Sequence, residues 1–227
     1  MTELLKVENL TIKSANQTLV DNLSYTLNSG ETLAIVGESG SGKSISSLAL
    51  LGLLPNSLSI TGQAYLTDSQ TEQAISLPIE KNSLSNKNKP KQTENIFRQI
   101  RGKRIGMIFQ EPMTALNPLH TVGKQIAESL SLAGVAKKHW RQRTLELLSQ
   151  VNIADPESKL ARYPHELSGG QRQRIMIAMA LAQDPDIIIA DEPTTALDVT
   201  LRHEILGLLH RLKNERGMVA LACGSTY

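Results

Sequence analysis

The stretch Gly37–Ser44, with the sequence GESGSGKS, decides the fold expected for this chain of 227 residues. An apolar run, residues 32–36 (TLAIV), precedes it, and a segment of helical character, residues 45–51 (ISSLALL), follows it. This order of strand, glycine-rich loop and helix matches the pattern G-x-x-x-x-G-K-[ST]. It predicts a loop that binds the phosphate groups of a nucleotide.

The residue types in this loop suit that chemistry. Glycines at 37, 40 and 42 allow a tight turn in which backbone N–H groups point at phosphate oxygens, with Glu38, Ser39 and Ser41 between them. The helix that opens at Lys43 adds the positive partial charge of its N-terminus. We expect Lys43 to reach the β- and γ-phosphates and the Ser44 hydroxyl to bind Mg²⁺. A glycine-rich turn without a ligand is the alternative, and the flanking strand and helix favour phosphate binding.

Length and composition exclude several classes of protein. A chain of 227 residues can form one large α/β domain with a buried core. A net charge of +2 gives no argument for binding to nucleic acid or to an anionic surface. Cys223 is the only cysteine, which rules out a disulfide framework within one copy. No secretory signal starts the chain and no apolar run approaches the roughly 18 residues that span a bilayer, so we expect any membrane role to come through a partner.

Hydrophobic patterning predicts an α/β fold, mainly parallel at its core, with strands at the start and helices in the middle. We expect a single domain over residues 1–227, with a helical subdomain over 111–182 that begins in a Pro- and Asn-punctuated loop at 111–119. Strands are expected at 4–12, 18–27, 59–66, 104–110, 186–192 and 217–222, and helices at 122–132, 139–151, 171–182 and 200–215.

Residues 67–95 differ in composition from the rest of the chain. They are rich in Ser, Asn, Gln, Lys and Thr and hold few large apolar side chains, which predicts an exposed, partly mobile insertion. The lysines at 81, 87, 89 and 91 could form a basic arm for nucleic acid. No aromatic residue is interleaved with them, so we favour a solvated loop and expect no nucleic-acid partner.

A second pattern places two carboxylates at the end of a strand. The aliphatic run at 186–190 (DIIIA) is typical of a buried parallel strand, and it ends in Asp191 and Glu192. Ligands gather at the carboxyl ends of such strands. We expect Asp191 to orient Mg²⁺ and Glu192 to accept a proton from the water that attacks the γ-phosphate, or to align that water. An exposed Asp-Glu pair is the alternative, and Lys43 in the same chain favours the catalytic interpretation.

The segment Leu167–Gln171 (LSGGQ) predicts a second anion site. Ser168 is placed to cap a helix, and Gly169 and Gly170 leave backbone N–H groups accessible at its start, next to Gln171. Two anion sites in one chain imply that this helix end serves the ATP held by another copy or by a sister domain. A plain helix start with a flexible glycine pair is the alternative.

With these motifs, the chain resembles the ATP-binding subunits of ABC transporters over nearly its whole length. The resemblance implies that Gln110 links Mg²⁺ to the lobe that faces the permease, and that Ala196, Leu197 and Asp198 form the D-loop. Three segments, 107–126 (MIFQEPMTALNPLHTVGKQI), 163–181 (YPHELSGGQRQRIMIAMAL) and 190–200 (ADEPTTALDVT), look like the oligopeptide, dipeptide, nickel and microcin C uptake group. Within that group the chain is similar to the first ATPase half of YejF-type importers, which carry two ATPase halves in one chain.

The resemblance also implies a fold, cofactors and partners. The fold would be that of a P-loop NTPase, with a mainly parallel core sheet, an N-terminal antiparallel β subdomain and a helical signature subdomain. The cofactors would be ATP and Mg²⁺. The partners would be integral membrane permease subunits, contacted through residues 111–132, a second ATPase domain and, indirectly, a periplasmic or surface substrate-binding protein. The protein would lie peripherally at the cytoplasmic face of the inner membrane, where paired ATPase domains close on two ATP molecules and reopen after hydrolysis.

Two features depart from the family pattern. No aromatic residue lies at 14–16 to stack on adenine, and Tyr25 is expected in the following strand. Family members also carry a switch histidine close to the position of Cys223, where this chain has ALACGSTY. We therefore expect a C-terminus that is cut short or shifted in reading frame, an exposed sheet edge with low solubility, and impaired ATP turnover.

Two further functional classes remain open from the sequence. A soluble ABC ATPase that acts on nucleic acid or ribosomes would share the signature, but such proteins tend to carry long coiled-coil or zinc insertions, which this chain lacks. A non-catalytic ATP-binding fragment would occupy a partner ATPase or permease without turnover. ATP hydrolysis at an ordinary rate would exclude the fragment, and co-purification with nucleic acid would favour the soluble ATPase.

Overall fold

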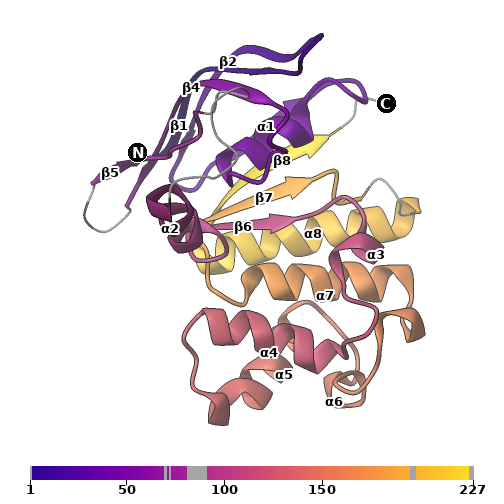
Figure 1. Ribbon diagram of the computed structural model, residues 1–227. Coiled ribbons are helices and arrows are strands. Elements are labelled where there is room, and N and C mark those ends of the chain that lie inside the picture. Colours follow the sequence, from indigo (N-terminus) through magenta and orange to yellow (C-terminus); the bar gives the residue numbers. More distant parts are fainter. Residues whose placement is uncertain (1, 69–70, 72, 81–90, 195–197, 225–227) are drawn as a thin grey trace. The chain divides into compact units, whose positions relative to one another are not determined.

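The computed structural model describes residues 2–68, 71, 73–80, 91–194 and 198–224 (Figure 1). The chain divides into two compact units, one formed by residues 1–101 with 219–227 and the other by residues 102–218. The lysines at 81, 87 and 89 and the D-loop residues Ala196 and Leu197 lie outside the described residues. Among the residues that are described, no helix combines the length and the apolar character that a membrane span requires.

The first unit contains an antiparallel sheet with the strand order β2-β1-β4-β5. Its strands are β1 (Glu3–Lys13), β2 (Thr18–Asn28), β4 (Ser59–Thr67) and β5 (Ala74–Ser76), so the first three predicted strands are confirmed. Leu5 and Val7 point to the buried side of β1, as alternation requires. The register then shifts between Val7 and Leu10, where Asn9 has a φ of 52°. This bulge turns Leu10 and Ile12 back into the core.

The same unit contains the strand, loop and helix predicted at the phosphate motif. β3 (Thr32–Val36) pairs in parallel with β8 (Val219–Gly224), and α1 (Lys43–Leu50) follows the loop. α2 (Lys91–Ile100) carries Phe97, whose ring closes against Gly52 behind the end of α1. A Cβ at Gly52 would lie 2.4 Å from this ring, so the contact depends on glycine.

The described residues within 67–95 are more ordered than the composition of the segment suggested. β5 pairs with β4, and Leu77 donates its N–H to the carbonyl of Ala64 at 2.8 Å. Leu77 and Ile79 are each only 3% exposed, and α2 already begins at Lys91. The expectation of an exposed insertion is therefore wrong for Leu77 and Ile79, whereas Ala74–Ser76 form a strand that is exposed as expected, and 91–95 are helical. Composition averaged over the segment concealed the short apolar alternation that adds a strand to β4.

The second unit combines a parallel strand pair with helices. β6 (Ile105–Ile108) pairs with β7 (Ile187–Asp191), and every residue of β7 is buried, which confirms the buried strand predicted there. The helices are α3 (Pro112–Ala115), α4 (Val122–Leu132), α5 (Trp140–Gln150), α6 (Pro156–Lys159), α7 (Gly169–Leu181) and α8 (Val199–Arg216), with short 3₁₀ turns η1 (Lys137–His139) and η2 (Pro164–Glu166).

The short helix α3 lies where an irregular loop was predicted. The Glu111 side chain caps it by accepting a hydrogen bond from Met113 N, and Pro112 occupies the first turn, where a missing N–H does no harm. These two residues therefore form a helix start, a signal that the Pro- and Asn-rich composition of 111–119 obscured.

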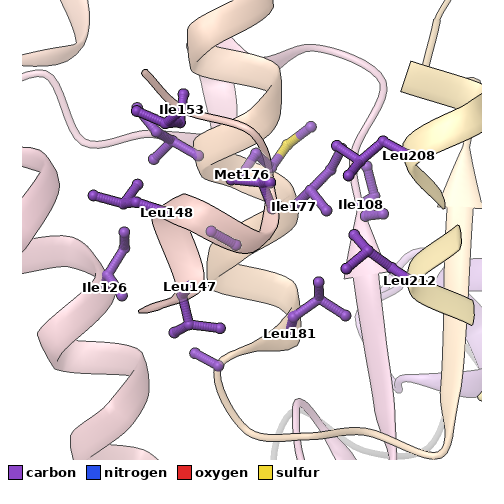
Figure 2. Packing of buried hydrophobic residues seen from close by; sticks show 14 of the residues in the cluster. Ile108, Ile126, Leu147, Leu148, Ile153, Met176, Ile177, Leu181, Leu208 and Leu212 are labelled. Atoms are coloured by element: carbon purple, nitrogen blue, oxygen red, sulfur yellow. The ribbon is translucent and has the colours of Figure 1, made fainter. Parts of the chain in front are cut away.

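The core of the second unit surrounds α7. Figure 2 shows Leu147 and Leu148 of α5 on one side of Met176 and Ile177, and Leu208 of α8 on the other side. Because α7 is packed on both sides, its direction is set by the whole unit. The signature segment at its N-terminus therefore starts from a rigid helix.

Candidate active-site residues

The predicted phosphate loop connects β3 to α1. Gly37 N donates to Gly224 O at 3.3 Å, which extends the β3–β8 pairing by one residue. The loop then turns through a hydrogen bond from Ser41 N to Glu38 O at 3.2 Å. The sequence prediction of strand, loop and helix at this motif is confirmed.

Glycine is required in this loop for two reasons. Gly42 has a φ of 92°, in the left-handed region that side chains disfavour. A Cβ there would also lie 2.6 Å from Leu19 O and 2.7 Å from Val20 Cγ2, so the loop is seated directly against β2. Gly40 shares the left-handed conformation, with φ 81°, but a Cβ at Gly40 would meet open space.

Lys43 lies inside the loop. Its side chain is only 6% exposed, and Nζ donates to Gly37 O and Glu38 O, both at 2.8 Å. Lys43 is the first residue of α1, and the N-cap residue Gly42 has no side chain that could bind the N–H groups at this helix end. The positive partial charge of the helix N-terminus therefore lies close to Lys43. This combination of a buried cation, a helix N-terminus and a glycine-rich loop fits the phosphates of a nucleotide. Ser44, half-buried in the first turn of α1, offers a hydroxyl for a metal ion on those phosphates.

The far side of α1 packs on β8. Ser47 Oγ lies 3.3 Å from Cys223 Sγ, and both groups are buried. Cys223, which occupies the region expected for the switch histidine, is thus a packing residue beneath α1. Tyr25 lies in β2 as predicted, and burial of its hydroxyl raises the pKa of Tyr25 above the usual range. A phenol buried at its polar end is not placed to stack on a base.

The second unit brings two predicted residues together at the ends of its parallel strands. Glu192 follows β7 and Gln110 follows β6, and Gln110 Nε2 donates to Glu192 Oε2 at 3.0 Å. Asp191, the last residue of β7, is 6% exposed. The parallel pairing of Ile108 with Ala190 explains this meeting, because strands that run the same way end at the same edge.

Glu192 has an unusual backbone conformation, which sequence reasoning missed. Its φ is 44°. The other non-glycine residues with positive φ in the described part of the chain are all Asn or Asp, which tolerate this region (Asn9, Asn22, Asn152, Asp155 and Asp184). A glutamate there carries strain of about 1–3 kcal/mol, and such strain concentrates at functional sites.

A buried glutamine supports the turn that holds Glu192. Gln173 on α7 is 1% exposed, and its Nε2 donates to Pro193 O at 2.7 Å. The sequence offers little indication of this role for Gln173. It shows only a glutamine within a predicted helix, at a position that is buried in the structure.

The signature segment forms a capped helix start, as predicted. Ser168 Oγ accepts from Gln171 N at 3.3 Å, and the Gln171 side chain accepts from Ser168 N at 3.0 Å. An open hollow of about 380 Å³ lies in front of this turn, lined by Ser168, Gly169, Gly170, Gln171, Arg174, Asp198 and Leu201. Asp198 reaches the hollow because it caps α8, accepting from Leu201 N at 2.9 Å.

The two signature glycines meet different surroundings. A Cβ at Gly169 would meet nothing within 4 Å, whereas one at Gly170 would lie 2.8 Å from the end of the Leu201 side chain. The fold therefore does not require glycine at 169. The absence of a side chain there keeps the hollow open.

Charged groups fix the first turns of this helix. Arg174 donates to Val151 O at 3.0 Å and pairs with Glu204 on α8 at 2.8 Å.

Two glutamates elsewhere in the second unit have lowered pKa values. Just before the signature, the Tyr163 N–H and then the Arg162 guanidinium hold the pKa of Glu166 below its usual range. On α5, the Arg143 guanidinium and then the Gln142 amide lower the pKa of Glu146 in the same way.

Mg²⁺ needs few ligands from the protein when the phosphates of a substrate also bind it. Within the described ranges, no group of three or more His, Cys, Asp or Glu side chains could hold a metal ion. Mg²⁺ commonly takes one or two protein carboxylates and completes its shell with water and substrate phosphates. Ser44 in the first unit, and Gln110 and Asp191 in the second, each carry a side-chain oxygen of the kind that Mg²⁺ binds.

Comparison with known proteins agrees with the motifs. The family described as ABC transporter matches residues 20–195. The chain is 49% identical over 223 residues to the peptidoglycan transport ATP-binding protein YejF of Agrobacterium fabrum, which covers 96% of this chain and 38% of YejF. It is 44% identical over 220 residues to the dipeptide transport ATP-binding protein DppD of Escherichia coli, covering 95% of this chain and 62% of DppD. The chain thus spans less than two thirds of these relatives.

Solved structures show the same fold. A dimeric structure of the ATP-binding cassette MJ0796 in a post-hydrolysis state with ADP and Pi has a TM-score of 0.74 at 29% identity, covering 97% of this chain and 88% of the other. The structure of cbiO1 from Clostridium perfringens has a TM-score of 0.76 at 24% identity, covering 100% and 80%, and supports the fold alone. The expected α/β fold of a P-loop NTPase is confirmed, and this chain belongs to the ABC transporter family.

Proposed function

We propose that this chain is an ATP-binding component that couples ATP binding and hydrolysis to the import of peptides or peptide-like compounds through a membrane permease. The observation that carries the proposal is the loop Gly37–Ser44, which encloses the buried Lys43 ammonium at the start of α1. The peptide class is supported by the relatives, whose named functions are peptidoglycan and dipeptide transport. These names favour transport over action on nucleic acid or ribosomes.

The loop residues would bind the nucleotide. Lys43 would exchange its hydrogen bonds to the loop carbonyls for the β- and γ-phosphates, and the backbone from Gly37 to Gly42 would donate N–H groups to the same oxygens. The Ser44 hydroxyl, Gln110 and Asp191 would hold Mg²⁺. When bound, the metal ion supplies positive charge against the phosphate oxygens.

Hydrolysis would depend on Glu192. Its carboxylate would accept a proton from the attacking water or align that water, while the Gln110 amide orients Oε2. The assignment of these residues and of the phosphate loop to one nucleotide rests on the family motifs.

A second ATPase domain would complete the machinery. Ser168, Gly169, Gly170, Gln171 and Asp198 line one hollow, which suits contact with the phosphates of an ATP held by that other domain. The dimeric state of the related cassette MJ0796 supports this arrangement. The second domain would belong to another copy, a sister chain or a further part of a longer protein.

Residues 111–132 would contact the permease. Met113, Leu119 and Leu132 are large apolar side chains with exposed fractions of 46%, 81% and 68%, as expected of a surface that a partner covers. We propose that this contact holds the protein at the cytoplasmic face of the inner membrane, with a substrate-binding protein acting indirectly through the permease.

The test compares Mg-ATP binding and turnover in the purified chain with those of two variants. Lys43→Ala should abolish both ATP binding and turnover, whereas Glu192→Gln should keep binding and lose turnover. Lys138→Ala, which changes an exposed lysine on η1, is the matched control and should behave as the unaltered chain does. A folded chain that binds no ATP would contradict the proposal, and binding without turnover would contradict its hydrolytic part.

A further inference from the structure

A buried amide holds the backbone directly after the proposed catalytic carboxylate. Gln173 is 1% exposed, and its Nε2 donates a hydrogen bond to the carbonyl of Pro193 at 2.7 Å. Pro193 follows Glu192 in the chain, so this hydrogen bond restrains the peptide between Pro193 and Thr194, one residue beyond the carboxylate residue. A buried side-chain amide paired with a loop carbonyl restrains that loop, because losing the bond leaves polar groups unsatisfied.

The turn needs such a restraint. Glu192 has a φ of 44°, a conformation that glutamate does not favour by itself. Strained residues persist when surrounding contacts determine their conformation. Gln110 contacts the side chain of Glu192, and Gln173 contacts the backbone that follows it.

The restraint comes from the signature helix. Gln173 lies on α7, which starts with the capping box between Ser168 and Gln171. The first turns of α7 thus carry both the proposed site for a second domain's ATP and the hydrogen bond to the carboxylate turn. Both belong to the second unit, residues 102–218.

We propose that Gln173 is a positioning residue for ATP hydrolysis, which fixes the turn at Glu192 and ties its orientation to the signature helix. This inference rests on the proposed role of Glu192. Gln173 itself does not contact the reacting atoms. Its contribution is to keep the carboxylate in the geometry that hydrolysis requires, because a small misplacement of a catalytic group is costly in rate.

The kinetic test uses Gln173→Met, which keeps the length of the side chain and removes the donor. We expect kcat for Mg-ATP to fall by about 10- to 100-fold, while KM for ATP stays within about twofold because the phosphate loop is untouched. Trp140→Phe is the matched control, since it removes another side-chain bond to a carbonyl in the same unit, from Trp140 Nε1 to Val135 O at 2.7 Å. It should leave kcat unchanged.

A second measurement does not depend on turnover. Amide hydrogen exchange in the nucleotide-free protein should become faster over residues 187–194 in Gln173→Met, and stay unchanged over 175–181 of α7. The Trp140→Phe variant should show ordinary exchange over residues 187–194. If Gln173→Met fails to fold, Gln173→Asn, whose amide is too short to reach the carbonyl, serves in both experiments with the same expected results.

The outcomes separate this inference from the proposed function. Turnover that survives in Glu192→Gln would refute the proposed role of Glu192. Turnover lost in Glu192→Gln but unchanged in a folded Gln173 variant, with unchanged exchange over 187–194, would overturn the inference alone. In a chain without measurable turnover, unchanged exchange over 187–194 would overturn it by itself.

Discussion

The phosphate loop at Gly42 and the turn at Glu192 both contain a left-handed residue, but different contacts stabilise the two. At Gly42, a left-handed backbone and a close approach to Leu19 leave no room for a side chain, and the sequence supplies glycine. At Glu192, the backbone is also left-handed, yet the sequence supplies a long, charged residue. Contacts from Gln110 and Gln173, distant in sequence, hold it there. The loop therefore fits its neighbours because Gly42 has no side chain, whereas the turn is held by side chains from elsewhere in its unit.

The largest expected effect concerns glycine in the loop. Gly42→Ala should lower the free energy of unfolding by about 3 kcal/mol, because it adds left-handed strain to a contact of 2.6 Å with Leu19 O. Gly40→Ala should cost only about 1 kcal/mol, since strain acts there without a clash. Urea denaturation measures both values. Equal costs would mean that the loop is not seated against β2.

At the turn that contains Glu192, a substitution is expected to raise the free energy of unfolding rather than lower it. Glu192→Asn should raise the free energy of unfolding by about 1 kcal/mol, because asparagine tolerates a φ of 44°. Glu192→Gln keeps both the side-chain length and the strain, so its stability should stay within about 0.5 kcal/mol of the unaltered chain. Turnover should be lost in both variants. If Glu192→Asn is less stable than Glu192→Gln, Glu192 is not strained, and backbone strain does not distinguish its turn from the phosphate loop.

The smallest expected effect tests the signature. Gly169→Ala should raise the free energy of unfolding by about 0.5 kcal/mol, because the added Cβ meets nothing and glycine is unfavourable in a helix. ATP turnover should nevertheless fall, since the methyl group enters the open hollow. Denaturation and turnover measured on the same samples decide the matter. Unchanged turnover in the more stable variant would mean that the hollow does not serve a second nucleotide.

Several features could be predicted from the sequence because their signals are local. The motif at 37–44 carries its strand, loop and helix in consecutive residues, and the run of isoleucines before Asp191 has the pattern of a buried strand. The predicted bounds of α4 agree with the structure, and those of α5 and α8 do so closely, since each has an uninterrupted helical pattern. These elements depend little on the rest of the chain.

Other features depend on tertiary contacts that no local pattern records. The hydrogen bond from Gln173 to Pro193 joins α7 to the turn after β7, and Glu192 in that turn has a φ that its residue type does not predict. The strand β5 forms because β4 offers it a pairing edge. A composition average over residues 67–95 could not show this. Sequence reasoning therefore proposed residues for the site, but it did not point to Gln173, which we propose holds one of them in place.

The pairing of β3 with β8 has a consequence for how the protein is made. Thr32 pairs with Ala220, so the strand that leads into the phosphate loop meets this neighbour only after the ribosome has added all of residues 102–218. The second unit is continuous in sequence and can fold as it emerges, whereas the first must wait to close a very long loop. We therefore expect a nascent chain to gain its signature helix early and its support beneath α1 late. A nascent chain would then bind ATP only after β8 has been synthesised.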